Sequence, residues 1–218
     1  MDEKKTILAY GDSNTHGYDA KRASRFTEDE RWTGRLNQSL GANFSVKEEG
    51  LNGRTTVFTD DLQEGRNGLL YLLPALESHE PIDLLIFMLG TNDCKDRFHL
   101  SVEEIAAGME LLVQKAITHQ VAWRNGEPNI LLLAPAPIEP GYKNTAVYQA
   151  MGPLSLEKSQ QLATYYQEIA ARYGCHFIDV GSIPGIKMEP TDYMHLSAAS
   201  HQLLALVLTK KINDIFVK

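Results

Sequence analysis

The chain has 218 residues, a length that fits one domain with a full hydrophobic core, so we expect a single domain over residues 1–218. Its 28 acidic and 21 basic residues give a formal net charge of −7, which argues against a nucleic-acid partner because such proteins need a basic surface. No apolar stretch approaches the roughly 20 residues of a membrane span. The N-terminus has no apolar segment of signal-peptide length, so we predict a cytoplasmic protein.

The first part of the chain predicts two strands and two helices. An apolar run at residues 6–10 is typical of a buried strand, and it stops at the turn-forming residues GDS, which places Ser13 at the carboxyl end of that strand. Residues 18–32 are irregular and rich in charge. A helix is expected over residues 33–40, where Gly41 ends it, followed by a strand over residues 44–48 and a helix over residues 68–79.

The middle of the chain predicts strand, helix and strand. Residues 83–89 and 129–134 are apolar without alternation, which is typical of strands that are covered on both faces of a parallel sheet. Between them, apolar residues recur at helical spacing over residues 101–119, and Ser101 with Glu104 forms a capping box at the start.

The last part adds a long irregular stretch, residues 136–153, then a helix over residues 155–173 that Gly174 ends. A strand over residues 176–180 and a helix from about residue 197 complete the chain. Strands and helices alternate throughout, which predicts a three-layer α/β/α sandwich around a flavodoxin-like, doubly wound parallel sheet of five strands. Because long loops in compact domains usually carry function, we expect residues 18–32 and 136–153 at the carboxyl edge of the sheet.

Polar motifs follow three of the predicted strands. GDSN follows the first, GTND the third, and DYMH comes after the fifth with Asp192 and His195 three residues apart. A hydroxyl nucleophile, an imidazole to take its proton and a carboxylate to orient the imidazole are the parts of a Ser-His-Asp hydrolase. Ser13 alone is more typical of a helix cap, and Asn92 alone of a turn, so the combination carries the prediction.

Other residues have plainer interpretations. Asp12 and Asp93 are expected to bond to nearby backbone in turns. Arg54 and Trp32 are candidates for lining a substrate pocket, against a solvated arginine and a packed tryptophan. Cys94 and Cys175, together with six further histidines, match no metal-ligand or redox spacing. We therefore expect reduced thiols, no metal and no cofactor.

Four sequence blocks resemble the consensus blocks of the SGNH hydrolases, also called GDSL-type esterases and lipases. They are YGDSN, GLNG at residues 50–53, GTND and DYMH, and they occur in the family's order over almost the whole chain. The segments EEGLNGRTT, MLGTNDCK and RWTGRL further resemble the bacterial arylesterase and acyltransferase branch. One position departs from the pattern, because Asn14 stands where the family name has leucine. It lies beside the nucleophile and is expected to affect substrate preference more than the reaction.

The resemblance implies a role for each matching residue. Ser13 is the expected nucleophile, His195 the general base and then acid, and Asp192 the group that orients His195. The backbone N–H groups of Ser13 and Gly53 and the side-chain amide of Asn92 form the expected oxyanion hole.

The expected activity is therefore hydrolysis of short-chain acyl or aryl esters, with acyl transfer to other alcohols as a side activity. The expected partner is a small-molecule ester, and the branch implies a homo-oligomer. Two alternatives stay open. One is a carbohydrate O-acetyl esterase with the same catalytic groups. The other is a flavodoxin-like flavin-binding module in which GDSNTHG cradles a phosphate.

Overall fold

A parallel β-sheet forms the centre of the structure, a computed structural model that describes residues 3–216. Its five strands are β1 (Lys5–Gly11), β4 (Phe44–Gly50), β5 (Leu84–Met88), β6 (Ile130–Ala134) and β7 (His176–Asp179). They lie in the order β4-β1-β5-β6-β7, and every neighbouring pair is parallel. This order is that of a flavodoxin-like, doubly wound sheet, so the predicted fold class is confirmed.

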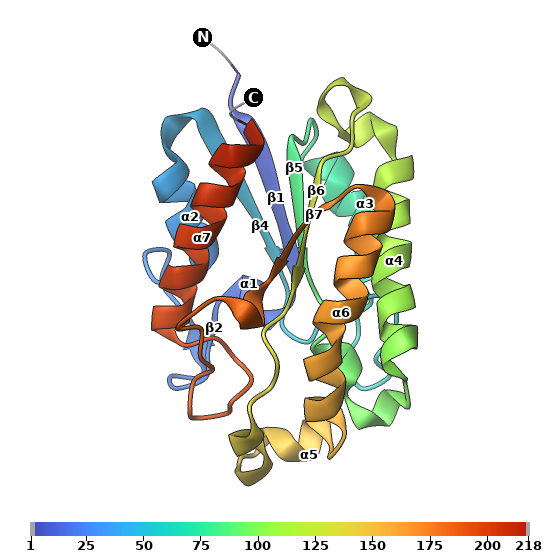
Figure 1. Ribbon diagram of the computed structural model, residues 1–218, viewed down its shortest axis with the longest axis vertical. Helices are drawn as coiled ribbons and strands as arrows, with labels where there is room; N and C mark the ends of the chain where they lie inside the picture. Colours follow the sequence, from blue (N-terminus) through green and yellow to red (C-terminus); the bar gives the residue numbers. More distant parts are fainter. Residues whose placement is uncertain (1–2, 217–218) are drawn as a thin grey trace.

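Two helix layers cover the sheet, one on each face, as Figure 1 shows. One layer contains α2 (Trp32–Leu40) and α7 (Ala198–Phe216), and the other contains α3 (Gly68–Ser78), α4 (Val102–Thr118) and α6 (Ser155–Tyr173). Side chains of strand β1 pack against both helix layers. Ile7 and Ala9 belong to the core beneath α2 and α7. Leu8 and Tyr10 belong to the core on the opposite face. Successive side chains of a strand point to opposite faces, which explains the continuous apolar runs.

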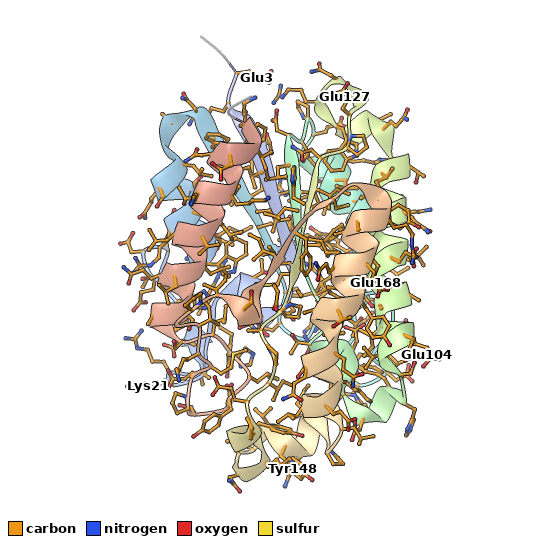
Figure 2. The ribbon with its side chains drawn as sticks, in the orientation of Figure 1. Glu3, Lys21, Glu104, Glu127, Tyr148 and Glu168 are labelled. Carbon is orange, nitrogen blue, oxygen red and sulfur yellow. The ribbon has the colours of Figure 1, made fainter. Side chains whose placement is uncertain are left out.

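The predicted helix boundaries agree closely with the structure. Ser101 caps α4 in a capping box with Glu104, as the sequence predicts, and Gly174 ends α6 in the left-handed conformation. Figure 2 shows side chains filling the space between the sheet and both helix layers, with the labelled Glu104 on the outer side of α4. Within residues 3–216, no helix combines the length and apolar character needed to cross a bilayer.

Short elements occupy the stretches that the sequence predicts as irregular. After β1 come the one-turn helix α1 (Ser13–His16) and a small hairpin, β2 (Tyr18–Asp19) with β3 (Ser24–Arg25). The later stretch contains helix α5 (Val147–Met151), at the end of the molecule opposite to the chain termini in Figure 1. Single 3-10 turns occur at Gly41–Asn43, Asn92–Cys94, Asp96–Phe98, Gln120–Ala122, Arg124–Gly126, Pro140–Asn144 and Val180–Ser182.

Candidate active site

The sharp turn after β1 places Ser13 at the carboxyl edge of the sheet. The backbone of Gly11 runs so close to the next strand that an added Cβ would lie 2.7 Å from the carbonyl oxygen of Met88, so only glycine fits there. Asp12 then caps the short helix α1, because its Oδ1 accepts a hydrogen bond from the backbone N–H of Asn14 at 2.9 Å. Ser13 follows as the first residue of α1 and is 7% exposed.

His195 and Asp192 lie beside Ser13 although 182 residues separate Ser13 from His195. Nε2 of His195 is 2.8 Å from Oγ of Ser13, and its Nδ1 is 2.5 Å from Oδ2 of Asp192. The other carboxylate oxygen of Asp192 accepts the backbone N–H groups of Met194 and His195, both at 3.0 Å. The carboxylate is thus fixed by the backbone of the turn that carries the histidine.

These contacts decide how the imidazole is protonated. Burial raises the pKa of Asp192, but the hydrogen bonds from His195 and the backbone outweigh it, so the net pKa lies below the ordinary value. An ionised carboxylate only accepts hydrogen bonds, so the proton of a neutral His195 lies on Nδ1. Nε2 is then free to accept the proton of Ser13, which is the arrangement a general base needs.

Gly53 and Asn92, the two other predicted site residues, line the same cavity as Ser13. Strands β1 and β5 are neighbours, with Gly11 opposite Met88, so Asn92 after β5 comes close to the turn after β1. The amide of Asn92 donates one hydrogen bond to the carbonyl oxygen of Arg54 at 3.1 Å. Gly53, just before Arg54, has a left-handed backbone with φ of 79°. A cavity of about 360 Å³ is lined by Gly53, Asn92 and the Ser13–His195–Asp192 group together.

The wall of this cavity includes residues that sequence reasoning missed. Tyr18 comes from the first long loop, and its ring centroid lies 4.7 Å from that of His195. Val147, Ala150 and Met151 come from α5 in the second. Both loops were expected at this edge of the sheet, but no motif marks which of their side chains face the cavity.

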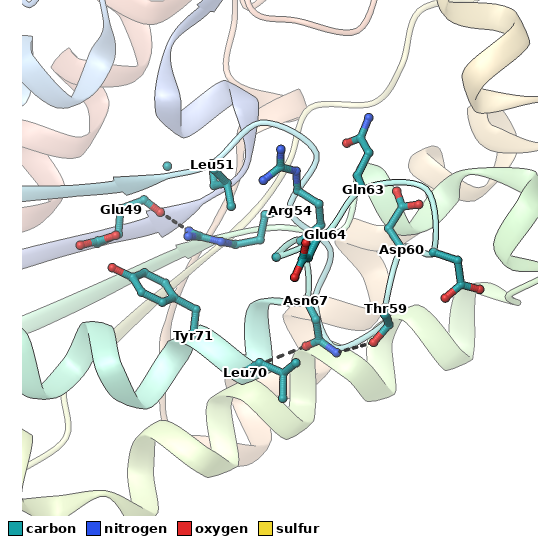
Figure 3. Close-up of a pocket in the computed structure, with 14 residues that line it drawn as sticks. Glu49, Leu51, Arg54, Thr59, Asp60, Gln63, Glu64, Asn67, Leu70 and Tyr71 are labelled. Carbon is teal, nitrogen blue, oxygen red and sulfur yellow. Dashed lines mark hydrogen bonds between the residues drawn. The ribbon is translucent and has the colours of Figure 1, made fainter.

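A larger cavity of about 710 Å³ adjoins the first, because Gln63 and Arg66 line both. Figure 3 shows its wall, in which Arg54 extends between Glu49 and Tyr71. Gln63 and Glu64 are among the polar side chains of the remaining wall. Asp61 also lines this cavity.

Arg54 is not solvated, so that interpretation is wrong: the residue is 3% exposed and donates to the carbonyl oxygens of Gly11, at 3.0 Å, and Glu49. Its guanidinium also lies 4.3 Å from the ring centroid of Tyr10. These contacts hold the loop after β4 against the end of β1. Trp32 is fully buried in the core and does not line the cavity, which agrees with the plainer interpretation of that residue.

The carboxylate of Asp93 bonds outside its own turn, which differs from the expectation. Its carboxylate reaches across to Thr56, accepting the backbone N–H at 2.9 and 3.1 Å and the hydroxyl at 2.5 Å. The carboxylate of Asp12 bonds to the backbone of its own turn, at Asn14. Burial raises the pKa of each of these two carboxyls to about 6, because their hydrogen bonds lower it less than the loss of water raises it.

The remaining candidates lie outside the cavity. Cys94 and Cys175 are unpaired, and burial raises the pKa of the Cys94 thiol, which works against a nucleophilic thiolate. Across residues 3–216, the structure brings together no group of three or more histidine, cysteine or acidic side chains that would hold a metal ion.

Comparison with known proteins places this geometry in context. A profile described as the GDSL-like Lipase/Acylhydrolase family matches residues 9–203. The native M. smegmatis aryl esterase is 34% identical over 97% of this chain and 100% of its own, with a TM-score of 0.89. Est24, a carbohydrate acetylesterase from Sinorhizobium meliloti, is 34% identical over 98% of this chain and 100% of its own, also with a TM-score of 0.89. No match was found among curated proteins.

Proposed function

Since the chain belongs to the GDSL-like lipase/acylhydrolase family and is a carboxylic ester hydrolase, we propose that it cleaves short-chain acyl or aryl esters through an acyl-enzyme on Ser13. The observation that carries the proposal is the continuous line of hydrogen bonds from Asp192 through His195 to the Ser13 hydroxyl. Each member of this line supplies one of the parts that nucleophilic catalysis needs.

In the first half of the proposed reaction, Oγ of Ser13 attacks the ester carbonyl carbon while its proton moves to Nε2 of His195. The carbonyl oxygen becomes negative, and the N–H groups of Ser13 and Gly53 would donate to it. One N–H of the Asn92 amide is used by Arg54, and the second would donate to the same oxygen. Collapse of this intermediate breaks the bond to the alcohol, which leaves with the proton from His195.

In the second half, His195 takes a proton from water, and the resulting nucleophile attacks the acyl group on Ser13. The acid is released when His195 returns the proton to Oγ of Ser13. A second alcohol in place of water would give a new ester, which is the expected acyl transfer. The partly apolar wall from α5 supports a small acyl or aryl group, because Val147 and Met151 lie there.

A carbohydrate O-acetyl esterase is the second candidate. Polar side chains of the adjoining cavity, such as Asp61, Gln63 and Glu64, would bond to sugar hydroxyls. Est24, which is similar to this chain, is named as a carbohydrate acetylesterase. Initial rates on aryl acetates and on acetylated sugars separate the two candidates. Membership of the hydrolase family decides against the flavin-binding alternative.

A serine-directed fluorophosphonate tests the proposed nucleophile directly. We expect intact mass to show one phosphonyl group per chain, located by peptide mapping on Ser13, and no mass gain in Ser13→Ala. Prior denaturation of the protein should abolish labelling, because the reaction needs the aligned base. Labelling of another residue, or an ester hydrolase that the probe neither labels nor inhibits, would contradict the proposal.

Asn92→Ala should lower kcat by about a hundred- to a thousandfold, the range for losing one oxyanion donor, and change KM far less. The amide meets the carbonyl oxygen most strongly once that oxygen is charged, so its loss affects the transition state more than substrate binding. Kinetics and melting temperature should be measured on the same preparation. A normal kcat with a lowered melting temperature would assign Asn92 to the turn alone.

A further inference from the structure

Asn14 is the residue directly after the proposed nucleophile, and its backbone is held on both sides. Its N–H donates to Asp12, and its carbonyl oxygen accepts the indole N–H of Trp32 at 3.0 Å. The residue is 5% exposed. This chain thus has a buried amide where the family name has leucine.

The side chain of Asn14 bonds to the backbone on both sides of His195. Its Oδ1 accepts the N–H of Leu196 at 2.8 Å, and its Nδ2 donates to the carbonyl oxygen of Met194 at 3.4 Å. One amide therefore meets one acceptor and one donor of the same segment, as the backbone of a neighbouring strand would. The first of these bonds is short and buried, and the second is longer and weaker.

We propose that Asn14 is a positioning residue that fixes the backbone of His195 relative to Ser13, an inference that rests on the proposed roles of those two residues. Ser13 and Asn14 are consecutive, so the amide ties the turn of the nucleophile to the segment of the base. Asp192 orients the imidazole ring, whereas Asn14 holds the main chain from which that ring projects. The two restraints act on different parts of the same residue.

Loss of the amide would leave unpaired groups next to His195. A leucine at position 14 fills a similar volume but neither accepts from Leu196 nor donates to Met194. A buried N–H without a partner is unfavourable, so the segment would shift to find one. Since a displacement of about 1 Å in a catalytic group is worth up to about a hundredfold in rate, the shift would reach the chemical step.

Two variants separate hydrogen bonding from packing. Asn14→Leu keeps most of the volume and Asn14→Ala removes it, and both lose the two bonds. We expect each to lower kcat on a small aryl acetate by about ten- to a hundredfold, with KM changed less than about threefold. Asn37→Leu is the matched control, because the Oδ1 of Asn37 accepts the N–H of Val46 at 3.0 Å and likewise joins two elements, away from the cavity.

Double variants identify the residue through which Asn14 acts. In an Asp192→Asn background the imidazole is already wrongly protonated, so adding Asn14→Leu should lower kcat by less than about threefold. In an Asn92→Ala background the base is intact, so the two losses should multiply. A purely structural effect of Asn14 would multiply in both backgrounds.

Several results would overturn the inference. They are a normal kcat in folded Asn14→Leu, a loss in Asn14→Ala that leucine restores, or losses that multiply with Asp192→Asn. The Asn37→Leu control shows how far a lost backbone tie alone lowers kcat, and a loss there equal to that of Asn14→Leu would also overturn it. Ser13→Ala distinguishes a failure of this inference from a failure of the proposed function. If Ser13→Ala is inactive while Asn14→Leu has normal kcat, only the role of Asn14 fails, whereas an active Ser13→Ala removes the proposed function itself.

Discussion

Ser13→Ala should remove nearly all ester hydrolysis, with kcat lower by about a millionfold if this group behaves as other serine triads do. Within the cavity that holds His195, no second hydroxyl or thiol lies at hydrogen-bond distance from Nε2 among the contacts of residues 3–216. The proposed oxyanion donors would remain, so a small rate above that of water is expected. The remaining activity can be measured as hydrolysis of an activated aryl acetate, at enzyme concentrations high enough to see a single turnover.

The same preparation should keep its fold. Among residues 3–216, the Ser13 hydroxyl has one hydrogen-bond partner, His195, so the melting temperature of Ser13→Ala should stay close to that of the wild type. Ser45→Ala, in β4 and outside the cavity, is the control for serine replacement as such and should keep full activity. Retention of more than a few per cent of the rate in Ser13→Ala would remove Ser13 from the reaction.

Much of the fold follows from local features of the sequence. Continuous apolar runs identify strands buried on both faces, and caps such as Ser101 and Gly174 set helix ends nearly to the residue. Parallel strands end at one edge of the sheet, so motifs after the first, third and fifth strands had to converge. The meeting of Ser13, Asn92 and His195 in one cavity is a consequence of this topology.

The contacts that hold the site together could not be predicted in the same way. Asp93 was expected to bond locally but reaches Thr56, 37 residues away. For Arg54 the sequence left a pocket-lining and a solvated arginine open, and neither predicts its bond to Gly11. The amide of Asn14 meets the segment around His195 across about 180 residues. Each contact depends on the exact path of a loop between two elements, and no periodicity or cap in the sequence encodes that path.

Helix boundaries can be predicted from the sequence better than pocket walls, for the same reason. A helix end is decided by residues within a turn of it, whereas a pocket wall is decided by which side of a loop faces inward. Tyr18 and Met151 both come from stretches expected at the right edge of the sheet, yet composition alone did not select them. The motifs of the site can be recognised in the sequence. The packing of distant loops against one another cannot, and this limits prediction of the site.

Asp192→Asn is expected to give the second largest loss, up to about ten-thousandfold in kcat. The asparagine would keep the shape of the side chain, but its amide N–H would donate to Nδ1 of His195. The imidazole would then carry its proton on Nε2, facing Ser13, and could no longer accept the hydroxyl proton. The wild-type carboxylate avoids this state because its pKa lies below the ordinary value, so it stays ionised at neutral pH.

The pH dependence and a matched variant make this prediction specific to the tautomer. In Asp192→Asn, raising the pH should restore part of the rate, because hydroxide would replace the missing base in deprotonating Ser13. Asp179→Asn is the control, since Asp179 also accepts a local backbone N–H, from Gly181 at 2.9 Å, but lies away from His195. It should keep wild-type kcat at every pH. A wild-type rate in folded Asp192→Asn would mean that the backbone bonds around His195, including those made by Asn14, suffice to orient the ring without a carboxylate.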